Sequence, residues 1–110
     1  MKAALRVRMQ ERDARRPGAL VDTYRILELF GDVAAELSRG LFSAEGRLRS
    51  YETVEFVAPV HAGDVLEVEG EILSSDPSSL TIQLEARNAT QPSTQMIARA
   101  RGTWVVSGER

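Results

Sequence analysis

The sequence predicts an α+β fold in which a curved antiparallel sheet wraps around one long central helix. One segment, residues 20–39, repeats apolar side chains with the period of a helix, while one alternating segment precedes it and four follow it. That order of elements is typical of a helix packed on an antiparallel sheet. The 110 residues, 43% of them apolar, have room for a single domain spanning residues 1–110.

The first expected element is a strand at Leu5–Gln10, where apolar and polar residues alternate. Residues 11–18 are charged and end in Pro17-Gly18, a pair that marks a turn. A helix is then expected from Leu20 to Arg39, with Gly40 as its C-terminal stop. We expect this helix to be covered on several sides, because its apolar face is broad: Tyr24, Ile26, Leu27, Leu29, Phe30, Val33, Ala34 and Leu37.

Four strands are expected after the helix, connected as hairpins. Their ranges are Tyr51–Val60, Asp64–Leu73, Leu80–Arg87 and Met96–Val106. Between them, His61–Asp64 and Ser74–Ser79 carry turn residues, and Asn88–Gln95 is a polar loop. The economical packing of these elements is the hot-dog fold, whose open sheet edges favour a dimer.

Composition excludes several kinds of chemistry. There is no cysteine and only one histidine, so we expect neither a thiolate nucleophile nor a metal or redox cofactor. The net charge of −2 does not favour nucleic acid as a partner. No apolar run approaches the roughly 20 residues of a membrane span and no signal peptide is evident, so the expected location is the cytoplasm.

Several segments together resemble the hot-dog β-aminoacyl-CoA ammonia lyases, which act on 3-aminobutyryl-CoA and β-alanyl-CoA. The likeness covers most of the chain, and the V-E-F-x-A-P-V strand, the A-G-D turn and the L-F-G-D helix core are its most specific parts. The segments are Leu5–Met9, Leu20–Asp22, Leu29–Ala34, Tyr51–Val60, Ala62–Asp64 and Gly102–Val106. The segment before the helix departs from the family pattern. There, Arg15, Arg16, Pro17 and Ala19 replace the family's His, Tyr, Gly and Asn.

The resemblance implies an enzyme that adds ammonia to, or eliminates it from, the β position of an acyl-CoA. It further implies a homodimer or a higher oligomer, with active sites between subunits and coenzyme A entering only as part of the substrate. Two other functions fit the same residues. One is an acyl-CoA thioesterase, and the other is a non-catalytic protein that binds acyl thioesters or small molecules.

Elimination at the β carbon requires a base for the α proton and hydrogen-bond donors at the thioester oxygen. The start of the helix can supply backbone N–H groups, so Gly18, Ala19 and Leu20 are the expected substrate-binding residues. Glu55 matches the family's V-E-F element and is the expected base, its pKa raised by apolar neighbours. Periodicity alone would instead place Glu55 on a solvated outer face. Asp22 is expected to relay a proton or hold an ammonium group, although a helix cap would also explain it.

Other polar residues have simpler explanations. His61 fits a turn, and the alternating arginines and glutamates fit ladders of charge on an outer sheet face. Arg15, Arg16 and Arg87 lie near expected loops and are alternative sites for a phosphate of coenzyme A.

Overall fold

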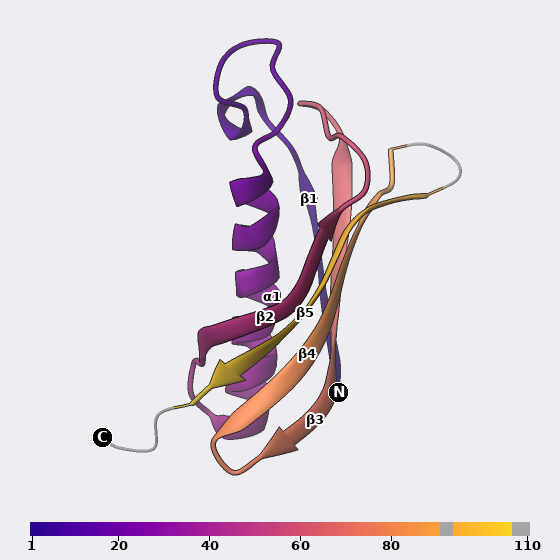
Figure 1. The fold of residues 1–110 in the computed structure, drawn as a ribbon. Coiled ribbons are helices and arrows are strands. Elements are labelled where there is room, and N and C mark those ends of the chain that lie inside the picture. The colour runs from indigo at the N-terminus through magenta and orange to yellow at the C-terminus, as the bar shows by residue number, and fades with distance from the viewer. Residues whose placement is uncertain (91–93, 107–110) are drawn as a thin grey trace.

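The computed structural model describes residues 1–90 and 94–106. One α-helix packs against a curved five-stranded antiparallel sheet (Figure 1). The sheet order is β1-β3-β4-β5-β2, so β1 and β2 form the two edges. The elements are β1 (Lys2–Arg8), the 3-10 turn η1 (Glu11–Asp13), α1 (Thr23–Phe42), β2 (Arg47–Phe56), β3 (Val65–Asp76), β4 (Ser79–Asn88) and β5 (Gln95–Val105). This architecture confirms the predicted fold class.

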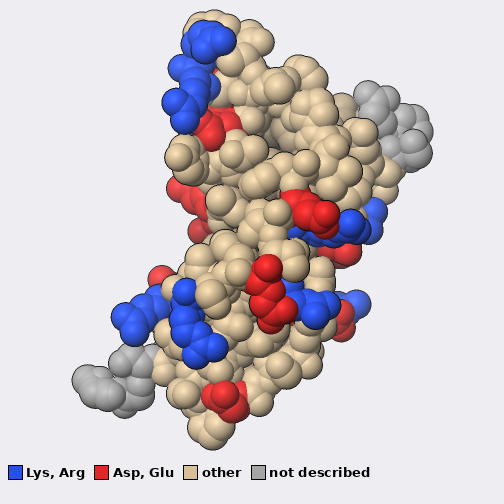
Figure 2. Space-filling model, viewed as in Figure 1, with Lys and Arg blue, Asp and Glu red and all other residues tan. Residues whose placement is uncertain are grey.

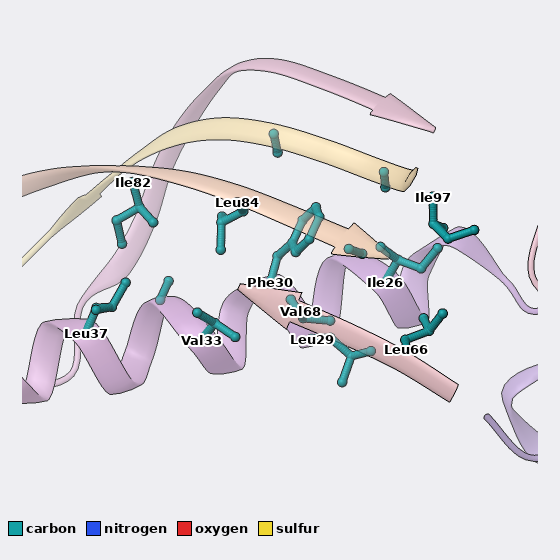
Figure 3. Close-up of a cluster of buried hydrophobic side chains, with 14 of the residues drawn as sticks. Ile26, Leu29, Phe30, Val33, Leu37, Leu66, Val68, Ile82, Leu84 and Ile97 are labelled. Atoms are coloured by element: carbon teal, nitrogen blue, oxygen red, sulfur yellow. The ribbon is translucent and has the colours of Figure 1, made fainter. Parts of the chain in front are cut away.

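The core lies between one face of α1 and the concave face of the sheet. The apolar positions of α1 recur every three or four residues and point at β3, β4 and β5 (Figure 3). Gly70 of β3 lets the helix approach, because a Cβ at this position would lie 2.7 Å from Val33 Cγ1. The fully buried large side chains are Phe30, Met9, Leu37, Leu66, Leu80, Ile82, Leu84, Ile97, Val33 and Val68.

The bounds of α1 differ from the prediction at both ends. Leu20 and Val21 are extended, because Val21 N–H donates to the Val60 carbonyl at 2.9 Å, and the helix begins only after Asp22. Gly40 lies inside the helix and does not stop it. The helix continues to Phe42, which packs against the core, and ends at Ser43, whose left-handed backbone (φ 61°) forms the cap.

The expectation that α1 is covered on several sides is wrong for the single chain. The face of α1 that points away from the sheet is polar, and it carries Glu28, Asp32 and Glu36. Tyr24, which was expected to widen the buried face, is 69% exposed. Among residues 1–90 and 94–106, therefore, the sheet and the segments next to it cover one face of the helix, and its opposite face is exposed. No helix in residues 1–90 and 94–106 is long and apolar enough to span a membrane.

The four later strands are present, but their connections differ from the prediction. β3, β4 and β5 are successive antiparallel neighbours, whereas β2 pairs with β5 and not with β3. The turn His61–Asp64 does form, with Asp64 N–H donating to the His61 carbonyl at 3.1 Å and Gly63 at φ 96°. It belongs to a connection that crosses between opposite parts of the sheet, and it does not close a hairpin.

Strand ends also differ from the prediction. β3 extends to Asp76 and β4 begins at Ser79, which leaves Pro77-Ser78 as a much tighter turn than the six residues expected. β2 ends at Phe56, so Pro59 lies beyond the strand. The predicted loop Asn88–Gln95 falls partly outside the described residues.

Candidate active site

A groove opens where the start of α1 meets the end of β2. Its volume is about 310 Å³, and its walls are mostly apolar. One wall comes from the start of α1 and the residues before it, and the other from the segment that ends β2. The lining residues are Leu20, Val21, Thr23, Ile26, Phe56, Val57, Ala58, Pro59 and Val60.

Backbone hydrogen bonds hold the two walls in place. Val21 N–H donates to the Val60 carbonyl at 2.9 Å, and Val57 N–H donates to the Ile97 carbonyl at 2.7 Å. Phe56 and Val57 remain 43% and 57% exposed, which is high for large apolar side chains. Figure 2 shows the result on this face, where an uncharged surface over the start of α1 and the end of β2 is bordered by charged side chains.

The first turn of α1, next to this groove, has one backbone N–H without an acceptor among the described residues. Asp22 is the N-cap, and its Oδ1 accepts the Tyr24 N–H at 3.1 Å. Arg25 N–H donates to the Asp22 carbonyl at 3.0 Å. For the Thr23 N–H, no acceptor is found among residues 1–90 and 94–106. Thr23 is also one of the residues that line the groove, and the first N–H groups of a helix are the ones left to bind acceptors outside it.

Asp22 is held as an anion. The Tyr24 N–H, followed by a 2.7 Å hydrogen bond from Arg15 Nε, lowers the pKa of Asp22 below its ordinary value. An ionised carboxylate suits the binding of an ammonium group better than it suits the acceptance of a proton. Its side chain is 20% exposed and borders a second hollow of about 500 Å³ next to the groove.

A second ion pair fixes the segment in front of the helix. Arg25 Nε donates to Asp13 Oδ1 at 3.0 Å, and the Asp13 side chain is only 10% exposed. Asp13 Oδ2 also accepts the Gln10 N–H at 2.6 Å, while the Asp13 carbonyl accepts the Asp22 N–H at 3.1 Å. Asp13 therefore connects the end of β1, η1 and the helix start, and so determines where Asp22 lies.

The three residues expected to bind substrate do not all reach the groove. Leu20 lines it and is 50% exposed. Gly18 and Ala19 form a turn before it, with Ala19 N–H donating to the Arg16 carbonyl at 3.0 Å, and neither is a lining residue. Gly18 has φ 79°, and a Cβ added there would have no neighbour within 4 Å, so its role is a turn conformation and not close approach to a ligand.

Glu55 lies beside the groove along the chain but on the opposite face of the sheet. Its neighbour Val54 packs against the core, while Glu55 accepts a 2.6 Å hydrogen bond from Arg99 Nε on β5. The Glu55 side chain is 54% exposed, so the desolvation expected from its apolar neighbours is absent in the single chain. The structure thus does not bring Glu55 and Asp22 together within one subunit.

The remaining polar candidates lie where the simpler explanations placed them. His61 is exposed, and its backbone N–H donates to Asp64 Oδ2 within the turn. The outer sheet face carries cross-strand pairs such as Arg6–Glu67 and Arg101–Gln83. Among residues 1–90 and 94–106, no group of three His, Asp or Glu side chains is arranged to hold a metal ion.

Comparison with known proteins identifies the family. A model of the thioesterase superfamily matches residues 28–94, which is more than half of the chain. The chain belongs to this superfamily. It is also 41% identical to a 3-aminobutyryl-CoA ammonia lyase from Acetoanaerobium sticklandii, over an alignment that covers 100% of this chain and 98% of the relative. This full-length likeness confirms the resemblance to the ammonia lyases of the superfamily.

Solved structures agree with this placement. The chain superposes on the β-alanyl-CoA:ammonia lyase of Clostridium propionicum with a TM-score of 0.86 and 25% identity, covering 97% of this chain and 85% of that one. It also superposes on a hexameric thioesterase from Yersinia pestis, with a TM-score of 0.85 and 18% identity, covering 93% and 88%. The second likeness shows the shared hot-dog fold.

Sequence reasoning missed most of the groove. It singled out Leu20 but not Thr23, Ile26 or Phe56, which line the same space. The available signal was the run of apolar residues that continues past the end of β2. The pairing of β2 with β5 and the bond between Val21 and Val60 bring these segments to the helix start, and local periodicity contains no information on either.

Proposed function

We propose that this chain is a β-aminoacyl-CoA ammonia lyase that adds ammonia to, or eliminates it from, the β carbon of an acyl-CoA. The observation that carries the proposal is the 41% identity to a 3-aminobutyryl-CoA ammonia lyase along the full chain. In the elimination direction, a base takes the α proton, the α–β double bond forms and the β carbon–nitrogen bond breaks. Ammonia and an enoyl thioester leave the site.

The groove at the start of α1 supports this chemistry. Its apolar walls suit the acyl chain and the pantetheine arm of the substrate. The free Thr23 N–H, at the positive end of the helix dipole, would stabilise the negative charge that develops on the thioester oxygen. The ionised Asp22, which borders the neighbouring hollow, would hold the β-ammonium group. Glu55 remains our candidate for the base in a site that a second subunit completes, because within its own chain it lies on the sheet face opposite the groove. The proposed reaction calls on no metal or redox cofactor.

We further propose that the working unit is at least a homodimer. The edge strand β2 is unpaired on its outer side in the described part of this chain, and the apolar side chains Leu48, Phe56 and Val57 are 45%, 43% and 57% exposed on or next to it. A second subunit at this edge would bury them and would close the groove from outside. The hexameric state of the Yersinia pestis thioesterase supports an oligomer as well.

One assay separates the three candidate functions. The purified protein is incubated with 3-aminobutyryl-CoA, and in the reverse direction with crotonyl-CoA and ammonia, while enoyl absorbance and free thiol are followed together. Enoyl formation without thiol release is the result expected of a lyase. Thiol release would identify a thioesterase, and binding of the thioester with neither change would identify a non-catalytic protein.

A further inference from the structure

The loop between η1 and α1 brings the side chain of Arg15 to that of Asp22. Ala14 and Val21 pair as an isolated antiparallel bridge, which closes the loop at the start of α1 (Figure 1). Arg15 and Asp22 are the residues that directly follow the two bridged positions. Arg15 Nε donates to Asp22 Oδ2 at 2.7 Å. The backbone therefore holds this arginine beside the carboxylate, while its side chain stays free to turn away.

The two carboxylate oxygens of Asp22 have partners that are held with different firmness. Oδ1 accepts the Tyr24 N–H at 3.1 Å, a bond to the helix backbone that forms the N-cap. Oδ2 accepts Arg15, whose side chain is 70% exposed, whereas that of Asp22 is 20% exposed. Exposed ion pairs contribute little net stability, because water and side-chain entropy compete with them. Oδ2 can therefore change its partner without unwinding the helix, and Oδ1 cannot.

The other arginine close to this carboxylate is already committed. Arg25 lines the same hollow as Asp22, but its Nε donates to Asp13 Oδ1 at 3.0 Å and its Nη1 donates to Glu28 Oε1 at 2.7 Å. Among the described residues, Arg15 is the cation that hydrogen-bonds to the Asp22 carboxylate. A guanidinium on Oδ2 occupies a position from which an ammonium group would donate to the same oxygen.

We propose that Arg15 is a displaceable occupant of the ammonium site and weakens the binding of thioesters that carry a β-ammonium group. Such a substrate has to replace Arg15 at Asp22 Oδ2. An enoyl thioester has no positive charge at its β carbon, so it leaves the ion pair intact. Arg15 thereby reduces the preference of the site for the amine-bearing thioester over the enoyl thioester. This inference rests on the proposed function, in which Asp22 holds the ammonium group, and it adds a specificity-determining residue to that site.

Removal of the competing cation tests the proposal in steady-state kinetics. For Arg15→Gln, we expect KM for 3-aminobutyryl-CoA to fall roughly two- to fivefold, the effect of losing one exposed ion pair. KM for crotonyl-CoA should not change. In the reverse direction, an ammonium ion bound beside the enoyl thioester meets the same competitor, so KM for ammonium should fall by a similar factor.

Two matched variants separate this competition from a general effect of charge. Arg15→Lys keeps a cation that can reach Asp22, so its KM values should stay close to those of the wild type. Arg39→Gln also removes one exposed arginine from an ion pair, here with Glu45 at 2.8 Å near the other end of α1. It should leave all three KM values unchanged. A fall of KM in Arg39→Gln equal to that in Arg15→Gln would overturn the specific role of Arg15.

Binding of inert analogues tests the same step without turnover. The thioethers S-(3-aminobutyl)-CoA and S-butyl-CoA have no thioester carbonyl to acidify the α proton, so they do not react. By isothermal titration calorimetry, Arg15→Gln should bind the amino analogue roughly two- to fivefold more tightly than the wild type does, and S-butyl-CoA equally well. Thermal unfolding of the same samples should show that the variant remains folded.

The outcomes of the titration are independent of those of the activity assay. A selective gain for the amino analogue supports displacement of Arg15, even if the protein shows no ammonia-lyase activity. Unchanged affinities, weaker binding of the amino analogue alone, or weaker binding of both analogues would overturn it, even if the protein is an ammonia lyase. A wild-type protein that binds neither analogue would also overturn it.

Discussion

Glu55 and Asp22 are carboxylates in different surroundings, and those surroundings predict different behaviour on substitution. Glu55 is half exposed and has one strong partner, Arg99. Asp22 is mostly covered and accepts hydrogen bonds from both the backbone and Arg15. A residue that only pairs with a neighbour should be replaceable, whereas a base should not.

We expect Glu55→Gln to lower kcat of the ammonia-lyase reaction by about 10²–10⁴-fold with little change in KM, because the amide cannot accept the α proton. Arg99→Gln removes the same ion pair but leaves the carboxylate, so it should keep most of the activity. Steady-state kinetics of both variants measure the difference. An equally small fall of kcat in the two variants would mean that Glu55 is not the base and only forms an ion pair on the outer face of the sheet.

For Asp22, stability should depend on pH. Because the folded protein lowers the pKa of Asp22, the carboxylate stabilises the fold above its unfolded pKa, and this contribution is lost as the pH falls through the lower folded value. Asp22→Asn should keep the helix cap at neutral pH but flatten the pH dependence of the unfolding midpoint below about pH 4. Thermal unfolding of wild type and variant across the acidic range measures the difference. If the unfolding midpoints of wild type and variant depended on pH in the same way, the lowered pKa of Asp22 in the folded protein would be contradicted.

The same Asp22→Asn variant also tests the ammonium site. If the charge of Asp22 holds the β-ammonium group, KM for the 3-aminoacyl thioester should rise while the affinity for the enoyl thioester stays the same, because only the former carries the positive charge. A cap without a catalytic role would leave both values unchanged.

At the scale of the elements, the start of α1 permits an unusually specific test of the carbonyl site. Thr23 is the first helical residue, where proline is well tolerated, and Asp22 has φ −69° and ψ 139°, a conformation that suits the residue before a proline. Thr23→Pro should therefore keep the helix and remove only the free N–H. We expect a fall in kcat of at least about tenfold, with Thr23→Ala, which keeps the N–H, close to wild type. Full activity of Thr23→Pro would exclude this amide as the donor.

Two glycines on facing elements should respond in opposite ways to alanine. Gly40 lies inside α1 with only the flexible Met1 side chain nearby, at 3.5 Å from a Cβ, so Gly40→Ala should stabilise the protein by up to about 1 kcal/mol. Gly70→Ala should destabilise it by about 1–3 kcal/mol, because its Cβ would meet Val33 Cγ1 at 2.7 Å. Urea unfolding gives both values. A destabilising Gly40→Ala would mean that the helix ends earlier than Phe42.

At the scale of the whole molecule, the free β2 edge and the open side of α1 indicate a fold that is completed by association. The exposed Leu48, Phe56 and Val57 are a liability for an isolated subunit. If the dimer is the stable unit, its unfolding midpoint should rise with protein concentration, because association stabilises only the folded chains. Calorimetry over a wide range of concentration would show this rise, and a constant midpoint would indicate a stable monomer.

The sequence by itself determined the class of fold and the family. The alternation of β4 and the apolar period of α1 depend on which face of each element is buried, and that information is local. The V-E-F-x-A-P-V strand and the A-G-D turn were sufficient to indicate the ammonia lyases.

Only the tertiary structure decided what surrounds each candidate residue. The sheet order places β2 at an edge beside β5, so Glu55, which the alternation of the strand already directs outward, lies next to Arg99 and away from the groove. The bond between Val21 and Val60 replaces the first expected turn of α1 with an extended segment, so that Thr23 and Phe56 meet in one groove. Strand pairing and helix ends depend on contacts between residues distant in the sequence, and these contacts outweigh local propensity.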